Sequence, residues 1–139
     1  MTFTAKQIED IICQGLPAAR LQGLKIDAVG ADWVEARFPF SDTMLRPGGS
    51  ISGPTIMGLA DAAMFAAIMA RLGRLEMAVT QDLNIHFLRK PRDSDLIARA
   101  SILRLGRRSV VMEVQVFSDG ERDKPAAFVT GTYALPFEA

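Results

Sequence analysis

The sequence is poor in cysteine, with Cys13 as its single example. One cysteine excludes a disulfide framework within the chain and is typical of a reducing compartment. The opening residues MTFTAKQIED also lack the basic and apolar regions of a signal peptide. We therefore expect a cytoplasmic protein.

The sequence has no excess of either charge. Sixteen basic residues balance sixteen acidic ones, so the chain has no net charge with which to hold a polyanion, and we expect no nucleic-acid partner. It also lacks an uninterrupted membrane-length run. The apolar stretch over 56–69 contains Asp61 and is shorter than the roughly 20 residues that cross a bilayer. We expect no membrane partner.

The chain does contain enough hydrophobic residues for one core. It has 139 residues, of which 49% are hydrophobic, so we expect a single domain over residues 1–139. Thr4 and Gln7 fit a capping box, and we expect an N-terminal helical segment over 1–22. Extended patterns at 24–29 and 33–38 predict a hairpin, which a loop rich in Gly and Pro follows at 41–54.

A long apolar helix and a series of strands make up the rest of the predicted order. The helix should begin near Pro54 and end near Ala70, and four alternating segments then predict strands over 78–88, 95–105, 109–118 and 126–135. Two strands, one helix without a polar stripe and four further strands predict an α+β domain in which an antiparallel sheet wraps around a central helix. Gly58 costs about 1 kcal/mol against alanine inside a helix, so we expect a close backbone contact there.

The start of the long helix is a candidate binding site for a carbonyl oxygen. Ser52-Gly53-Pro54 is a strong helix-start pattern. The N–H groups of Gly53, Thr55 and Ile56 would then be unpaired at the positive end of the helix dipole, where they could stabilise a developing oxyanion. An ordinary capped helix explains the same residues.

Asp61 is a candidate catalytic residue because an ionised carboxylate in an apolar helix is costly without partners. It could act as a general base or nucleophile in an apolar pocket lined by Met57, Met64 and Phe65. A hydrogen bond to a neighbouring loop is the alternative.

The spacing between the two candidate groups suggests a second subunit. Gly53 and Asp61 lie eight residues apart, about 12 Å along a helix axis, which is too far for both to act on one carbonyl group. If two chains pack their helices antiparallel, Gly53 of one chain approaches Asp61 of the other. We therefore expect a homo-oligomer with the site at a two-fold interface.

Several motifs, in this order, resemble the hotdog-fold acyl-CoA thioesterases, in particular the branch of the phenylacetic-acid degradation (PaaI-like) thioesterase. The resemblance extends from about Gly48 to Tyr133. The matching residues are Leu59-Ala60-Asp61, Val79-Thr80, Leu83-Asn84-Ile85, Phe87-Leu88-Arg89, Pro91 and Gly106-Arg107-Arg108.

The resemblance implies a hotdog fold and hydrolysis of an acyl-CoA thioester without a metal or redox cofactor. Asp61 matches the family's catalytic acidic residue, Gly53 the glycine whose N–H polarises the carbonyl, and Thr80 a position that helps to orient water. It also implies a dimer, or a dimer of dimers.

Three positions differ from the family pattern, and at one of them Pro54 replaces the family's second glycine. Ser52 stands where the family has histidine, and its hydroxyl could still donate a hydrogen bond. Arg46 stands where the family has asparagine, and its fixed charge could reach a substrate carboxylate or face solvent. These differences leave a second interpretation open, a hotdog module that binds acyl-CoA without hydrolysing it.

The remaining candidates concern substrate binding. Two basic clusters, which include Arg89 with Lys90 and Arg107 with Arg108, could bind CoA phosphates, or they could be solvated strand ends. We also assign Asn84 to substrate binding. Alternation along 79–87 places Thr80, Asp82, Asn84 and His86 on one face of the strand, and we expect His86 to have a structural role or to lie at a subunit contact.

Overall fold

The computed structural model describes residues 3–73 and 77–136, and the predicted order of helices and strands is confirmed there. The helices are α1 (Ala5–Gly15), α2 (Pro17–Leu21) and α3 (Gly53–Leu72). The strands are β1 (Lys25–Val29), β2 (Trp33–Phe38), β3 (Val79–Phe87), β4 (Leu96–Leu105), β5 (Ser109–Ser118) and β6 (Ala127–Ala134). The loop predicted over 41–54 contains a 3-10 turn, η1 (Asp42–Met44), which the Gly and Pro pattern did not indicate.

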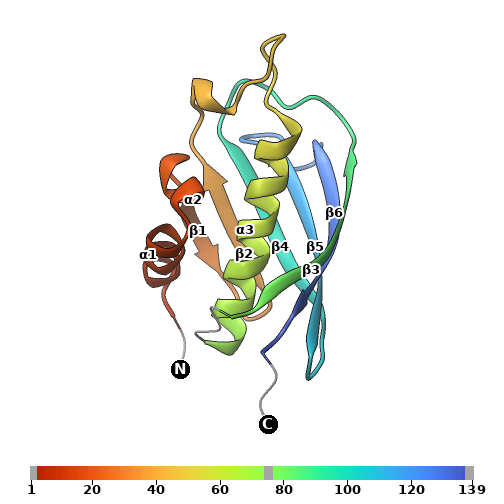
Figure 1. The fold of residues 1–139 in the computed structure, drawn as a ribbon. Helices are drawn as coiled ribbons and strands as arrows, with labels where there is room; N and C mark the ends of the chain where they lie inside the picture. Colours follow the sequence, from red (N-terminus) through yellow and green to blue (C-terminus); the bar gives the residue numbers. More distant parts are fainter. Residues whose placement is uncertain (1–2, 74–76, 137–139) are drawn as a thin grey trace.

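All six strands form one antiparallel sheet that curves around α3 (Figure 1). The strand order is β1-β2-β4-β5-β6-β3, so β1 and β3 form the two edges. The helices α1 and α2 lie beside α3 at the β1 edge, while β3 crosses on its other side. The predicted α+β fold, with a sheet wrapped around a central helix, is confirmed.

The ends of α3 follow from local chemistry. The Ser52 side chain caps the helix by accepting a hydrogen bond from the Thr55 N–H at 3.2 Å. Pro54 lies in the first turn, where its missing N–H removes no helical hydrogen bond. Gly73 ends the helix at a φ of 87°, a conformation that other residues adopt at a cost.

Most of α3 is buried, as its composition predicts, and α3 is therefore a core helix although its length and composition would suit a membrane span. Each large apolar side chain on the buried side, such as Leu59 or Ile68, stabilises the fold by about 1.5–3 kcal/mol. Residues of one line along the helix stay partly exposed: Pro54, Met57, Gly58, Asp61 and Phe65.

The prediction of a close backbone contact at Gly58 was wrong for contacts inside one chain. A Cβ at that position would meet no other described atom within 4 Å. The close approach to α3 occurs instead at Gly131 of β6, where a Cβ would lie 2.7 Å from the sulfur of Met64. Gly131 therefore lets the helix pack closely on the sheet.

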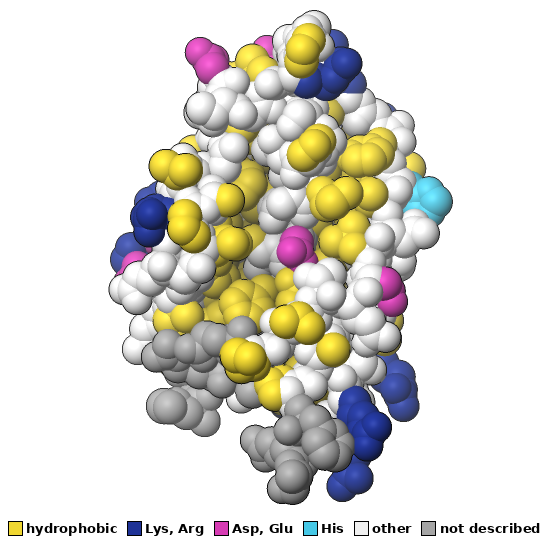
Figure 2. Space-filling view, in the orientation of Figure 1, with side chains coloured by type: hydrophobic (Ala, Val, Ile, Leu, Met, Phe, Trp, Pro, Cys, Tyr) yellow, Lys and Arg dark blue, Asp and Glu magenta, His cyan; other side chains and the backbone are white. Residues whose placement is uncertain are grey.

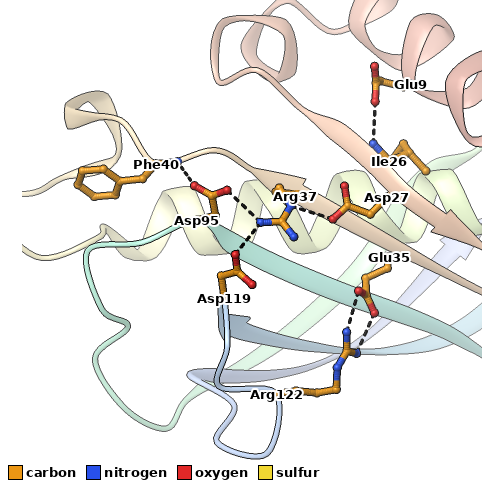
Figure 3. Close-up of polar contacts among 9 residues, drawn as sticks. All are labelled: Glu9, Ile26, Asp27, Glu35, Arg37, Phe40, Asp95, Asp119 and Arg122. Atoms are coloured by element: carbon orange, nitrogen blue, oxygen red, sulfur yellow. Dashed lines mark hydrogen bonds and ion pairs between the residues drawn. The ribbon is translucent and has the colours of Figure 1, made fainter.

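The N-terminal helix α1 is fixed to the edge of the sheet by a buried carboxylate. Thr4 and Gln7 form the predicted capping box, and Ile8 and Ile12 are buried. Glu9, which is 8% exposed, accepts a hydrogen bond from the Ile26 N–H of β1 at 2.8 Å (Figure 3). This bond satisfies a backbone donor of the edge strand and holds α1 in place.

Arg37 of β2 joins the ends of several strands (Figure 3). Its guanidinium contacts Asp27 at 2.8 Å, Asp95 at 2.9 Å and Asp119 at 3.1 Å. Asp95 also accepts a hydrogen bond from the Phe40 N–H at 2.8 Å. The cluster thus links β1, β2 and the segments that precede β4 and follow β5.

A second ion pair lies on the same sheet. Both terminal nitrogens of Arg122 donate to the carboxylate of Glu35, each at 2.8 Å (Figure 3). Arg99 lies 3.6 Å from the same carboxylate. The two-point geometry fixes the loop between β5 and β6 against β2.

Candidate active site

Asp61 lies near the middle of α3, on the line of residues that the sheet leaves uncovered. Figure 2 shows a hollow lined by hydrophobic side chains on this face of the molecule, and Asp61 is among the residues that line the cavities there. The carboxylate is thus open to a ligand while it remains anchored in the core helix.

Two hydroxyl groups hold one oxygen of this carboxylate. Thr80 donates to Asp61 Oδ1 at 2.8 Å, and Tyr133 donates to the same oxygen at 2.6 Å. Within residues 3–73 and 77–136, no group hydrogen-bonds to Oδ2. One oxygen is therefore fixed, and the other retains its lone pairs for a reaction. The alternative of a carboxylate bonded to a neighbouring loop was wrong, because both donors lie on strands.

A β-bulge in β3 turns Thr80 toward Asp61. Thr80 pairs with Tyr133, whereas the next pair joins Asp82 to Thr132, so Gln81 is the extra residue of the bulge. Directly paired residues share a face of the sheet. Thr80 therefore points inward with Tyr133, and the expected common face with Asp82, Asn84 and His86 was wrong for Thr80.

Sequence reasoning missed Tyr133. Its side chain is 4% exposed, and its ring stacks on Phe65 with 6.2 Å between the centroids. Burial raises the pKa of the Tyr133 phenol well above its usual value, and the negative charge of Asp61 raises it further. The phenol therefore keeps its proton at neutral pH and can donate a hydrogen bond to Asp61. The sequence did offer one indication: Tyr133 alternates with Val129 and Gly131 in the last strand, which places its side chain on the face toward α3.

Asp61 lines two cavities. One, of about 440 Å³, lies between α1, α3 and the start of β3 and includes Phe65, Thr80 and Tyr133. The other, of about 410 Å³, lies between α2 and the first turns of α3. Leu16, at the break between α1 and α2, lines both cavities.

The predicted apolar pocket beside Asp61 is present, but its lining residues differ from those predicted. Phe65 lines the larger cavity, whereas Met64 is fully buried in the core. Met57 is 42% exposed on the uncovered side of α3 and belongs to neither cavity lining. Residues of α1 and α2 provide the missing walls, which the motif around Asp61 could not indicate.

The start of α3 offers one N–H group. The prediction of unpaired N–H groups at Thr55 and Ile56 was wrong, because Thr55 donates to the Ser52 hydroxyl and Ile56 to the Ser52 carbonyl. The Gly53 N–H has no hydrogen-bond partner among the described residues. The Ser52 hydroxyl caps the helix and contacts the Thr55 hydroxyl at 2.7 Å.

A third cavity, of about 450 Å³, lies at this end of the helix. Gly53, Arg89 and Lys90 line it together with Phe87, whose ring would lie 3.3 Å from a Cβ at position 53. The structure thus brings one predicted basic pair next to the predicted carbonyl-binding glycine.

Four predicted binding residues lie apart from Asp61. Arg46 lies in the exposed loop before Gly53, and Asn84 lies on the outer face of β3. Arg107 and Arg108 occupy the turn between β4 and β5. None of these four residues is part of the lining of the three cavities. In the part of the chain that the structure describes, no three His, Cys, Asp or Glu side chains gather as metal ligands do.

Comparison with known proteins places the chain in a family. Residues 48–124 match the thioesterase superfamily, a stretch that includes Gly53, Asp61 and Thr80. The chain belongs to the thioesterase superfamily. A proposed esterase from Haemophilus influenzae is 30% identical over 115 residues, which cover 83% of this chain and 82% of that protein.

Solved structures of thioesterases have the same fold as this superfamily member. A proposed thioesterase from Silicibacter sp. TM1040 is 34% identical, has a TM-score of 0.87, and the match covers 97% of this chain and 93% of that one. A thioesterase from Haemophilus influenzae is 26% identical with a TM-score of 0.86, over 98% and 92% of the two chains. The phenylacetic acid degradation protein PaaI from Thermus thermophilus, in a mutant form, is 26% identical with a TM-score of 0.75, over 86% and 99%. The predicted hotdog fold is confirmed, and these relatives support thioester hydrolysis as the general activity.

Proposed function

We propose that this chain is an acyl-CoA thioesterase of the PaaI-like branch that releases a free acid and CoA, with Asp61 as general base or nucleophile. The observation that supports it best is the carboxylate itself. One oxygen of Asp61 is held by Thr80 and Tyr133, and the residue lines a cavity whose other walls are mostly apolar. A fixed carboxylate with one unshared oxygen suits attack on a carbonyl group.

The reaction needs a group that takes a proton from water. In the general-base form, Asp61 Oδ2 accepts a proton as the water oxygen bonds to the thioester carbon. The carbon–sulfur bond then breaks, and the proton passes to the thiolate of CoA. The Gly53 N–H, at the positive end of α3, stabilises the carbonyl oxygen while it carries negative charge.

The cavities suggest the class of acyl group. Apart from Asp61, no charged side chain of the described residues lines either cavity beside it. A neutral apolar or aromatic acyl group fits this lining, and a second carboxylate on the acyl group would be repelled by Asp61. Arg89 and Lys90 would hold phosphates of CoA. The other predicted substrate contacts stay predictions: Arg46, Met57, Asn84, Arg107 and Arg108.

The proposed site needs two chains. Gly53 and Asp61 of one chain lie about 12 Å apart along α3, too far to share one carbonyl group. The edge strand β3 exposes Val79 at 58% and Phe87 at 54%, a surface suited to a second copy. We propose a dimer or a dimer of dimers, in which Gly53 of one chain serves Asp61 of the other, and a cytoplasmic location.

One observation favours a second function, the binding of acyl-CoA without hydrolysis. Ser52 stands where the family has histidine, but its hydroxyl already caps α3 and contacts Thr55. A hydroxyl held in this way is not available to the substrate as the histidine would be.

Release of free thiol separates the two functions. The wild-type protein and Asp61→Asn should be compared on CoA esters with short, long, aromatic and dicarboxylic acyl groups. We expect release from neutral apolar esters and a fall of about 100-fold or more in Asp61→Asn. Binding of CoA without release from any ester would favour the binding module, and equal rates in Asp61→Asn would remove Asp61 from the mechanism.

A further inference from the structure

Tyr133 is closely engaged with the carboxylate of the proposed site. Its hydroxyl lies 2.6 Å from Asp61 Oδ1 and 3.1 Å from the Asp61 carbonyl oxygen. A hydrogen bond of this length to an ionised oxygen is among the stronger ones in proteins. Its ring is buried and stacked on Phe65, so the phenol has little freedom to turn away.

We propose that Tyr133 is a positioning residue for thioester hydrolysis, which together with Thr80 holds Asp61 Oδ1 so that Oδ2 faces the substrate. The inference rests on the proposed function and adds a residue to it. An aspartate carboxylate alone rotates broadly about its last torsion. Two donors on one oxygen stop that rotation and fix which oxygen reacts.

The sheet register makes the two donors a unit. Thr80 and Tyr133 are directly paired across β3 and β6; the alternation of β6 turns Tyr133 inward, and the bulge at Gln81 brings Thr80 to the same face. Asp61 reaches them from the helix, so three segments far apart in the sequence meet at one oxygen. A donor fixed by a backbone pair cannot follow the carboxylate if it turns, which makes the arrangement rigid.

The charges around the carboxylate are simple. The described residues of α1 and α2 that line the two cavities are uncharged: Ile11, Ile12, Gly15, Leu16, Ala18, Ala19 and Gln22. From β3 the facing residues are Val79 and Thr80, and from β6 Tyr133. Tyr133 stays neutral because burial and the charge of Asp61 raise its pKa. Both hydroxyls are therefore neutral hydrogen-bond donors to Asp61 Oδ1.

The consequence for the reaction is the same in both chemical forms. Oδ2 either accepts the proton of the attacking water or forms the bond to the thioester carbon itself. In each case the hydrogen bonds to Oδ1 keep Oδ2 aimed at the reacting atoms and leave its lone pairs unshared.

The test is Tyr133→Phe, which removes the hydroxyl and keeps the ring against Phe65. We expect kcat on the best neutral acyl-CoA ester to fall by about 10- to 100-fold, the range for a hydrogen bond to a charged group, with KM unchanged. A KM that stays constant while kcat falls separates a positioning role from a loss of substrate binding. Thr80→Val should act in the same direction, and Thr80→Ser should restore the rate.

Thr132→Val is the matched control. Thr132 is the neighbour of Tyr133 on β6 and points to the outer face of the sheet, so the loss of its hydroxyl should leave kcat and KM as in the wild type. Thermal unfolding shows whether each variant is folded.

The outcomes separate this inference from the function on which it rests. If Asp61→Asn is inactive while folded Tyr133→Phe keeps the wild-type kcat, the positioning role is wrong and the thioesterase stands. A fall in kcat that comes with a raised KM or with a lowered unfolding temperature would assign Tyr133 to packing alone. If the wild-type protein releases no thiol, the proposed function fails and the inference fails with it.

Discussion

At the scale of single residues, Leu16 has the most direct relation to substrate choice. It is 45% exposed at the break between α1 and α2 and lines both cavities that contain Asp61. Leu16→Ala should join the two spaces, so that kcat/KM rises about tenfold for bulkier acyl groups relative to smaller ones, a change of about 1.4 kcal/mol. A panel of CoA esters of increasing acyl size measures this shift.

Leu21→Ala is the control for that prediction. Leu21 lies on α2, is 82% exposed and belongs to none of the three cavity linings. It should leave the order of substrates unchanged. If Leu16→Ala also leaves the order unchanged, the acyl group does not bind in these cavities.

At the scale of elements, the carboxylates that join strands make stability depend on pH. The N–H of Phe40 and the guanidinium of Arg37 hold the pKa of Asp95 below its usual value. Arg122 in the same way lowers the pKa of Glu35. A lowered pKa in the folded state gives stability that is complete above the ordinary pKa, near 4, and is lost as pH falls through the folded value.

We therefore expect the urea midpoint of unfolding to fall as pH drops from about 5 to about 3. The Asp95→Asn variant should show a shallower fall, because one of the responsible carboxyls is gone. Asp93→Asn, an exposed neighbour in the same segment, should keep the wild-type slope. An equal slope in Asp95→Asn would mean that other groups govern the acid transition.

Local sequence patterns predicted the helices and strands. The features that they did not predict depend on pairing between segments far apart in the chain. The cap at Ser52 and the strand alternation are set by neighbours in the chain, so both could be predicted. The bulge at Gln81 depends on how β3 meets β6, and no residue in β3 alone indicates it. The contact of Tyr133 with Asp61 depends on the same pairing, and for that reason the site was predicted without one of its two donors.

At the scale of the whole molecule, the composite site predicts that two defective chains can restore each other. Asp61→Asn removes the carboxylate, and Gly53→Pro removes the N–H at a helix position where proline is accepted. If Gly53 and Asp61 act in different chains, a mixed dimer has one intact site. Random mixing should give about a quarter of the wild-type sites, measured as thiol release after the two proteins are refolded together.

Gly53→Ala is the control, because it keeps the N–H and adds a Cβ 3.3 Å from the Phe87 ring. It should retain more activity than Gly53→Pro. A mixture of the two defective chains that stays inactive, although mixed dimers form, would place both groups of each site in one chain.

The position of β3 at the edge of the sheet has a consequence for synthesis. Its sheet neighbour is β6, and the nearest pair joins Phe87 to Ala127. While the chain emerges from the ribosome, β3 therefore has no strand to pair with until β4, β5 and β6 have followed. This strand therefore waits unpaired while residues 88–127 are made, and we expect its pairing to be late because it joins segments far apart in the chain.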